Sequence, residues 1–402
     1  MKKYRLVLNQ NTFLWIKNKE GLAYQSKNYR EFVFSLSEKL RQICRHLLVL
    51  DHLYTIELTE EELNISDVRI FVDQLLEIDA GRLVSDTSTN KGIVSMKPVL
   101  KILEPVSYFV QKNERGVGGN IIQYIHELTF YINGSKYGNN QYYRQTIFPV
   151  KHESILEKEK ILHFIRNSKN PFLANINLVG NIFSFPNFEE LLHLIETFEI
   201  KVTICITASD ILSNKELLKK TDWYDKIYFR ILMDNKDAIN QVITFWEGLR
   251  IPFYVDFLIF SEQDFLDIEQ ISTTINGSFV PVYNGENIVF FESNIFICQE
   301  EIHSSALSKR EIFKRQATNI FHFGKLTVLA DGKVYADVNQ THLGTIADTA
   351  YSIVYKEFTE GTSWFRIRDF KPCKDCIYQW LCPSPSNYET IIGKPNLCHV
   401  KY

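Results

Sequence analysis

The sequence has little of what would place a protein in a membrane, outside the cell or on nucleic acid. No stretch approaches the roughly eighteen consecutive apolar residues that cross a bilayer. The N-terminus lacks the apolar core and small-residue cleavage site of a signal peptide. No Lys/Arg-rich block stands out, and the net charge is only −3 over 402 residues. We therefore expect a cytoplasmic protein without membrane or nucleic-acid partners.

Cysteine is scarce, with seven in the chain, but four of them are Cys373, Cys376, Cys382 and Cys398, spaced Cys-x2-Cys-x5-Cys-x15-Cys. These four are called the tail cysteines. Four thiolates in one short segment suit a closed four-coordinate metal site, because a Cys-x2-Cys turn can present two sulfurs to one metal. Disulfides need an oxidising compartment, for which nothing in the chain argues, and four unrelated core thiols are the other alternative.

The spacing of the tail cysteines alone does not identify the metal. Zinc ribbons repeat the Cys-x2-Cys turn, and a single such turn favours an iron–sulfur cluster over zinc without deciding between them. The segment around the cysteines is rich in Pro and Gly, which predicts that the metal supplies most of its order. The isolated Cys44, Cys205 and Cys298 lie in apolar surroundings and are expected to be core thiols, and the scattered His322 and His342 to be structural.

The first domain, residues 1–90, begins with short alternating apolar and polar segments at 4–9, 12–17 and 21–25, which predict antiparallel strands. A helical pattern follows over 30–50 and a second over 68–78, with a strand-like segment between them. The pattern therefore predicts a small α+β unit with three strands and two or three helices. A plain structural cap is the alternative to a functional module.

The second domain, residues 91–305, repeats a strand followed by a helix, which predicts parallel strands in an α/β sheet or partial barrel. We expect strands at 128–133, 175–180, 201–207, 226–234, 253–260 and 279–283, with helices at 155–166, 188–198, 236–249 and 265–275. Chemistry in such folds lies at the carboxyl ends of the strands. The loop after the first strand, 133–143, offers amides and phenols there but no acid, histidine or cysteine.

The third domain, residues 306–402, contains two alternating segments on either side of Asp331-Gly332, which predict a hairpin. Together with the tail cysteines, this hairpin resembles a SPASM domain, the cluster-binding tail of peptide-modifying radical SAM enzymes. Asp337 and Ser386 stand where that family has cysteines, and Phe321 and His322 occupy the window in which it has another. The resemblance implies that one auxiliary cluster is lost, while the tail cysteines hold the other as a 4Fe–4S cluster, with zinc as the alternative.

The loop after the first predicted strand of the second domain also resembles a radical SAM motif that has lost its cysteines. A radical SAM barrel has Cys-x3-Cys-x2-Cys-Tyr there, and this chain has Ser135-x3-Asn139-x2-Tyr142-Tyr143. The family's Gly-Gly-Glu segment becomes Gly-Asn-Ile at 180–182. The resemblance therefore implies no cluster in this loop, no S-adenosylmethionine binding and no catalytic residue.

The segments 126–129 and 380–389 resemble pseudo-radical-SAM (pseudo-SPASM) proteins of bacterial systems that mature ribosomal peptides (RiPPs), and the tail is also similar to grasp-with-SPASM peptide maturases. The fold implied is α/β: a degenerate radical SAM-like partial (β/α)6 barrel, a SPASM-like C-terminal domain and a small N-terminal α+β domain, similar to a peptide-recognition (RRE-like) module. The function implied is an accessory protein that binds a precursor peptide and a partner radical SAM or ATP-grasp maturase. The alternatives are an enzyme that uses its auxiliary cluster for electron transfer or substrate coordination, and a zinc-stapled binding protein.

Overall fold

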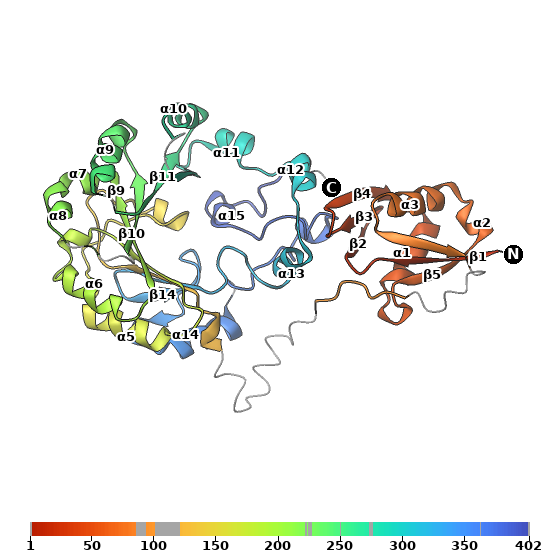
Figure 1. Cartoon of the computed structure of the whole chain (residues 1–402), viewed down its shortest axis with the longest axis horizontal. Coiled ribbons are helices and arrows are strands. Elements are labelled where there is room, and N and C mark those ends of the chain that lie inside the picture. The colour runs from red at the N-terminus through yellow and green to blue at the C-terminus, as the bar shows by residue number, and fades with distance from the viewer. Residues whose placement is uncertain are drawn as a thin grey trace.

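Three regions follow one another along the chain, and part of the C-terminal region lies between the other two (Figure 1). This computed structural model describes residues 2–85, 94–100, 121–221, 223, 227–249, 251–272, 276–361 and 363–400. No helix in those ranges is long and apolar enough to cross a membrane.

The N-terminal region contains two three-stranded antiparallel sheets, in the orders β5-β1-β6 and β2-β3-β4. The strands are β1 (Lys3–Leu8), β2 (Thr12–Lys17), β3 (Glu20–Gln25), β4 (Arg30–Ser35), β5 (Thr55–Thr59) and β6 (Gly81–Ser85). The helices are α1 (Glu38–Leu48), α2 (Glu60–Leu63) and α3 (Ser66–Glu77), with a 3₁₀ turn η1 (Leu50–His52). The α+β character is confirmed, but six strands replace the three that the sequence pattern predicted.

The predicted helix over 30–50 is wrong in its first part, where the chain forms strand β4. Residues of β4 pair with β3 along its whole length, and Phe34 packs against Phe71 of α3 with ring centroids 4.7 Å apart. The helix begins only after Ser37, whose Oγ accepts a hydrogen bond from Leu40 N at 3.1 Å. Cross-strand pairing and this N-cap therefore override a helical spacing of apolar residues.

The middle region forms most of a nine-stranded sheet, in the order β12-β11-β10-β9-β8-β7-β13-β14-β15. Its six strands β7 (Glu127–Tyr131), β8 (Asn175–Val179), β9 (Lys201–Thr207), β10 (Ile227–Met233), β11 (Phe253–Ile259) and β12 (Gly277–Pro281) pair in parallel. The helices are α5 (Lys158–Ser168), α6 (Phe188–Glu196), α7 (Ala208–Ser213), α8 (Lys215–Lys220), α9 (Ile239–Leu249), α10 (Glu262–Ser272) and α11 (Ile288–Asn294). Short 3₁₀ turns are η2 (Ile121–Tyr124), η3 (Tyr142–Arg144), η4 (Ile182–Ser184) and η5 (Lys236–Ala238). The predicted mixed α/β fold with a largely parallel sheet is confirmed.

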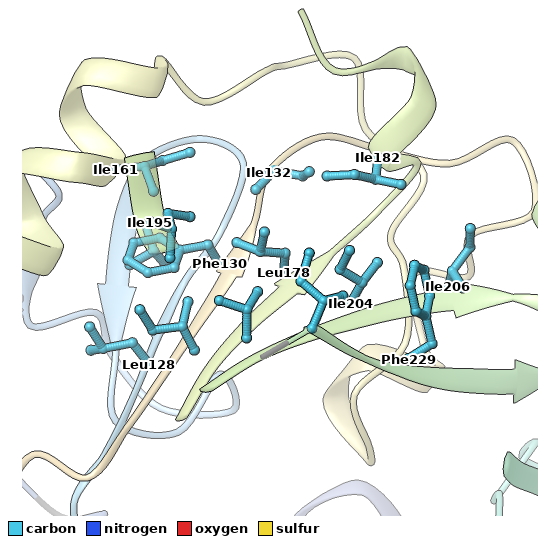
Figure 2. Close-up of a cluster of buried hydrophobic side chains, with 14 of the residues drawn as sticks. Leu128, Phe130, Ile132, Ile161, Leu178, Ile182, Ile195, Ile204, Ile206 and Phe229 are labelled. Carbon is cyan, nitrogen blue, oxygen red and sulfur yellow. The ribbon is translucent and has the colours of Figure 1, made fainter. Parts of the chain in front are cut away.

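The two faces of the parallel sheet carry different side chains. One face is apolar and packs against the helices: Phe130, Leu178 and Ile204 from three adjacent strands meet Ile161 of α5 and Ile195 of α6 (Figure 2). On the opposite face, polar side chains form hydrogen-bonded rows: Thr129, Asn177, Asn175 and Thr203 in one, and Arg230, Asp256 and Ser278 in another. Because neighbouring residues of a strand point to opposite faces, the alternation fixes which face meets the helices.

The C-terminal region begins with α12 (Gln299–Ser304) and α13 (Lys309–Ala317) and then forms the predicted hairpin. Its strands β13 (Lys325–Val328) and β14 (Lys333–Tyr335) turn at Gly332, whose φ of +82° favours glycine, and β15 (Gly344–Thr345) follows. Strand β13 pairs in parallel with β7, so the hairpin continues the sheet of the middle region. The last helices are α14 (Ala350–Glu360), η6 (Cys373–Asp375) and α15 (Asn387–Ile392).

The N-terminal region packs against this C-terminal region through an apolar contact. Phe13 and Tyr24 from the β2-β3-β4 sheet are buried with Ile377, Tyr378 and Leu381 in one cluster. The Tyr24 hydroxyl also donates to the Leu307 carbonyl at 2.8 Å. The tail therefore buries apolar surface of its own, which the sequence did not predict.

Glu357, near the end of α14, is a fully buried carboxyl without a basic partner among the described residues. It is 1% exposed and accepts hydrogen bonds from Trp364 N at 2.7 Å and Ser363 N at 3.1 Å. Burial raises the pKa of Glu357 from its usual 4.5 to about 7, although both N–H groups oppose the rise. The folded state therefore holds this proton more tightly than the unfolded state, and that stabilisation is lost as the pH rises from about 4.5 through about 7.

We expect Glu357→Gln to be more stable than the parent protein above pH 8, by on the order of 3 kcal/mol, because glutamine keeps the acceptor and carries no charge. The difference should shrink toward zero near pH 5. Denaturant unfolding at several pH values measures it, with the exposed Glu360→Gln as the matched control. A stability difference that does not change with pH would refute a buried, protonated Glu357.

Candidate metal centre

The tail cysteines come from a turn-rich segment. Cys373 opens the 3₁₀ turn η6 and Cys376 follows it, while Cys398 forms a bridge with Ile297. Backbone N–H groups donate to two of the sulfurs, from Tyr378 N to Cys376 Sγ and from Val400 N to Cys398 Sγ, both at 3.3 Å. All seven cysteines of the chain lie in the described ranges, and none is in a disulfide.

The four thiols share one neighbourhood. Burial raises the pKa of Cys382 to about 12, and the three other tail thiols add to the rise. Burial likewise raises the pKa of Cys373, with Cys398 contributing. As they stand, Cys373 and Cys382 are poor thiolates, and a bound metal would have to deprotonate them.

Arg368 is one positive charge of this neighbourhood, and Arg315 near Cys382 is another. The Arg368 side chain is nearly buried, and Nη1 donates to Cys373 Sγ at 3.7 Å while Nη2 donates to Glu389 Oε1 at 2.8 Å. Nε donates to the Pro383 carbonyl, which fixes the guanidinium. A guanidinium beside the sulfurs favours their ionised form and would offset part of the negative charge of a thiolate-bound metal.

The arrangement is not a finished single-ion site. Across the described ranges, no group of three or more His, Cys, Asp or Glu side chains is placed to hold a metal ion. The assignment of the tail cysteines as ligands therefore stays a prediction, supported by the identity of the donors and by their shared neighbourhood.

Ser135, the first residue of the Ser-x3-Asn-x2-Tyr loop, is held by a buried carboxyl. It lies beyond the carboxyl end of β7, and its Oγ donates to Asp210 Oδ2 at 2.7 Å. Asp210 is fully buried at the start of α7 and also accepts from Thr207 Oγ1 at 2.9 Å. Burial raises the pKa of Asp210, although both hydroxyls oppose the rise. Sequence reasoning missed Asp210, because 75 residues separate it from Ser135.

The other two positions of the loop have structural roles. Asn139 Oδ1 accepts from Gln141 N at 2.8 Å, which shapes the turn. Tyr142 packs against Phe148 and Phe260, with ring centroids 5.4 and 5.6 Å apart. Just before Asn139, Gly138 lies so close to the returning chain that a Cβ there would be 2.4 Å from the carbonyl carbon of Val150. The loop is therefore folded tightly onto apolar residues at the carboxyl end of the sheet, on the face opposite the helices.

Four further positions at which the sequence departs from the expected pattern also have structural partners. Ser386 caps α15: its Oγ accepts from Tyr388 N at 3.3 Å and it shares a capping box with Glu389. Ile182, in the segment that replaces Gly-Gly-Glu, is 1% exposed within the main apolar core. Asp337 and His322 come together, with Nε2 and Oδ2 3.7 Å apart.

Comparison with known proteins gives distant structural likenesses only. No family model matches the sequence, and no curated protein sequence is similar to it. Streptococcus suis SuiB bound to precursor peptide SuiA is 12% identical, with a TM-score of 0.48, over 100% of this chain and 99% of SuiB. SuiB bound to S-adenosylmethionine has 12% identity and a TM-score of 0.45, over 98% and 99%. The structure of anSMEcpe with bound AdoMet has 13% identity and a TM-score of 0.43, over 67% and 96%. We draw no assignment of family or activity from scores this low.

We expect Ser135→Ala to lower the free energy of unfolding by about 1–3 kcal/mol, because it removes a hydrogen-bond donor from a buried carboxylate. The exposed Ser213→Ala on the same helix as Asp210 should change it by less than about 0.5 kcal/mol. Denaturant unfolding at pH 7.5 compares the two. Equal effects would show that the Ser135 hydrogen bond does not stabilise this end of the sheet.

Proposed function

We propose that this chain is a non-catalytic, cytoplasmic accessory protein of ribosomal peptide maturation, which binds a precursor peptide and a partner maturase. It carries one 4Fe–4S cluster on its tail cysteines and none in the barrel. The observation that carries the proposal is the contrast between two places: at the carboxyl end of β7 a hydrogen-bonded hydroxyl and aromatic rings replace thiols, while four thiols gather in the tail. We divide the chain into a recognition domain (1–90), a degenerate radical SAM-like partial barrel (91–305) and a SPASM-like domain (306–402).

The loop with Ser135, Asn139 and Tyr142 does not fit an iron–sulfur cluster. It supplies a hydroxyl bound to Asp210, an amide used in a turn and a phenol packed among rings, and none is a soft anionic donor. Reductive cleavage of S-adenosylmethionine needs an electron from such a cluster. The proposal therefore assigns the barrel a binding role.

The tail residues do fit a metal group by their chemistry. Cys373, Cys376, Cys382 and Cys398 would hold it, and Arg368 would balance part of its charge. Four thiolates fill the protein-derived positions of a 4Fe–4S cluster or of a structural zinc and leave none open for substrate. When bound, such a group would cross-link the segment from 373 to 398. This supports a structural role for the group.

The N-terminal domain offers a place for a peptide beside strand β4. This strand is an edge of the β2-β3-β4 sheet, and a cavity of about 370 Å³ lies between it and the end of α3. The lining includes Phe32, Gln74 and Ile78. One wall lies outside the N-terminal domain, because His303 of α12 also lines the cavity and its Nδ1 pairs with Glu31 Oε1. An extended peptide can add to an edge strand through backbone hydrogen bonds while one side chain fills the adjacent cavity.

We expect protein purified without oxygen to contain about four irons per chain. Cys382→Ser should lose most of this iron, while Cys298→Ser should keep it, because Cys298 caps α12 outside the tail. Iron and sulfide analysis together with the visible spectrum measures the difference.

Two results, one from metal analysis and one from an assay with S-adenosylmethionine and a reductant, would contradict parts of the proposal. One zinc per chain with no visible chromophore would support the zinc-stapled binding protein instead. Formation of 5′-deoxyadenosine from S-adenosylmethionine by the reduced protein would show that the chain is an enzyme.

For the recognition domain, we expect Gln74→Trp to weaken peptide binding at least tenfold, because the indole fills the cavity beside β4. The exposed Gln263→Trp on α10 is the matched control. Fluorescence anisotropy of labelled peptides, taken from short reading frames next to this gene, gives the dissociation constants. Equal binding by both variants would place the peptide elsewhere, and no binding by the parent protein would remove the recognition role.

A further inference from the structure

A cavity of about 460 Å³ lies on the face of the parallel sheet that is opposite the helices. Polar and aromatic residues of three adjacent strands line it: Lys201 and Thr203 of β9, Tyr228 and Arg230 of β10, and Tyr254 of β11. Because strand residues next to them, such as Val202 and Val255, belong to the apolar core on the helix side, these five side chains point to the opposite face. Pro252 and Asn276, which precede β11 and β12, also line the cavity. The cavity therefore lies at the amino end of the sheet, whereas the Ser135 loop lies at its carboxyl end.

The lining of this cavity carries positive charge. It includes two cations, Lys201 and Arg230, and no carboxylate. Behind the lining, Arg230 Nε donates to Asp256 Oδ2, and the Asp256 side chain is only 1% exposed. Glu127, the other carboxylate that acts on Arg230, pairs with Lys325 at 3.9 Å. Each of these acids therefore has a cation of its own, and in the part of the chain that the structure describes no carboxylate pairs with Lys201.

Two tyrosine rings lie beside the two cations. The Tyr228 ring is 38% exposed, and Lys201 Nζ lies 4.0 Å from its centroid. Tyr254 is the register partner of Arg230 in the pairing of β10 with β11, so the two side chains lie next to each other on the same face. Each cation therefore has an aromatic ring beside it. An exposed ring in a concave place leaves apolar surface in water, which the ring of a ligand would cover by stacking.

The lining selects ligands by charge and by shape. Lys201 and Arg230 would repel a cationic ligand, and an anion without an apolar part would leave both tyrosine rings in water. A neutral aromatic ligand would contact the rings without using the charges. The Arg230 side chain is 28% exposed and Lys201 is exposed as well, so both can reach a carboxylate in the cavity. The cavity volume also lies within the range of small-molecule sites, roughly 300–1,000 Å³.

We propose that this cavity binds a carboxylate carried on an aromatic group, with the ring against Tyr228 and Tyr254 and the carboxylate between Lys201 and Arg230. Two kinds of molecule have this chemistry: a free aryl acid, and a peptide whose C-terminal residue is aromatic. The site includes neither the tail cysteines nor the cavity beside β4. The proposal therefore goes beyond the proposed function and does not depend on it.

The first test compares ligands on the full-length protein, with 3-phenylpropionate as the probe. We expect a dissociation constant in the millimolar range, as is typical of so small a ligand. 3-Phenylpropionamide keeps the ring without the charge, and propionate keeps the charge without the ring, so both should bind roughly tenfold more weakly. N-acetylphenylalanine represents the C-terminus of a peptide: binding as tight as that of the probe indicates the peptide source, and weaker binding indicates the free acid. Ligand-detected NMR titrations give the dissociation constants.

The second test uses variants of the lining. Lys201→Gln should weaken binding of 3-phenylpropionate about 3- to 10-fold and leave binding of 3-phenylpropionamide unchanged, because only a charge is lost. Lys169→Gln is the matched control, since Lys169 is also exposed and its Nζ lies 5.8 Å from the Phe198 ring centroid, outside this cavity. Tyr228→Leu should weaken binding of both phenyl compounds, and it serves if Lys201→Gln does not fold. Circular dichroism checks the folding of each variant.

Three results would overturn the proposal. These are equal binding of 3-phenylpropionate and 3-phenylpropionamide, binding by folded Lys201→Gln or Tyr228→Leu protein that equals that of Lys169→Gln, and no binding of either aromatic carboxylate at about 50 mM. In each case the contact between Lys201 and Tyr228 only stabilises the starts of β9 and β10.

Discussion

The parallel pairing of β13 with β7 is the contact that the arrangement of both candidate sites depends on. It makes the C-terminal hairpin a continuation of the parallel sheet, so the turn between β13 and β14 lies at the same end of the sheet as the loop after β7. The chain after β14 also contacts this loop, because Arg144 and Asn339 form two hydrogen bonds, of 3.0 and 2.8 Å. Without this pairing, the Ser135 loop and the segment around Asp337 would have no common frame.

The sequence predicts the parallel sheet well, because its strands are local runs of mostly apolar residues. In β9, for example, most side chains are buried, and the run can be recognised without knowing which strands pair with it. It fails at β4, where Phe32 and Leu36 imitate the period of the following helix. Only the pairing of β4 with β3 decides between strand and helix there, and pairing is not written in a local pattern.

The candidate sites divide in the same way. The tail cysteines are recognisable because their spacing is local, and the replaced positions because a family pattern marks them. Their partners are not recognisable: Asp210 reaches Ser135 across the strand order β7-β8-β9, and Arg366 reaches Asp337 through the packing of the tail on the hairpin. Such contacts follow from topology, which a local sequence pattern does not contain.

The apolar contact between the N-terminal sheet and the tail changes what a metal has to do. Tail residues Tyr378 and Leu381 are buried against Phe13 and Tyr24, so the segment near the cysteines is ordered partly by another domain. The sequence had assigned most of that order to the metal. A bound metal would therefore add local rigidity to a segment that already packs against the N-terminal sheet.

The contact also places the cysteine segment against the same sheet whose edge strand β4 borders the proposed peptide cavity. A peptide bound at that cavity would therefore lie close to the tail contact, because only β3 separates β4 from β2, the strand that carries Phe13.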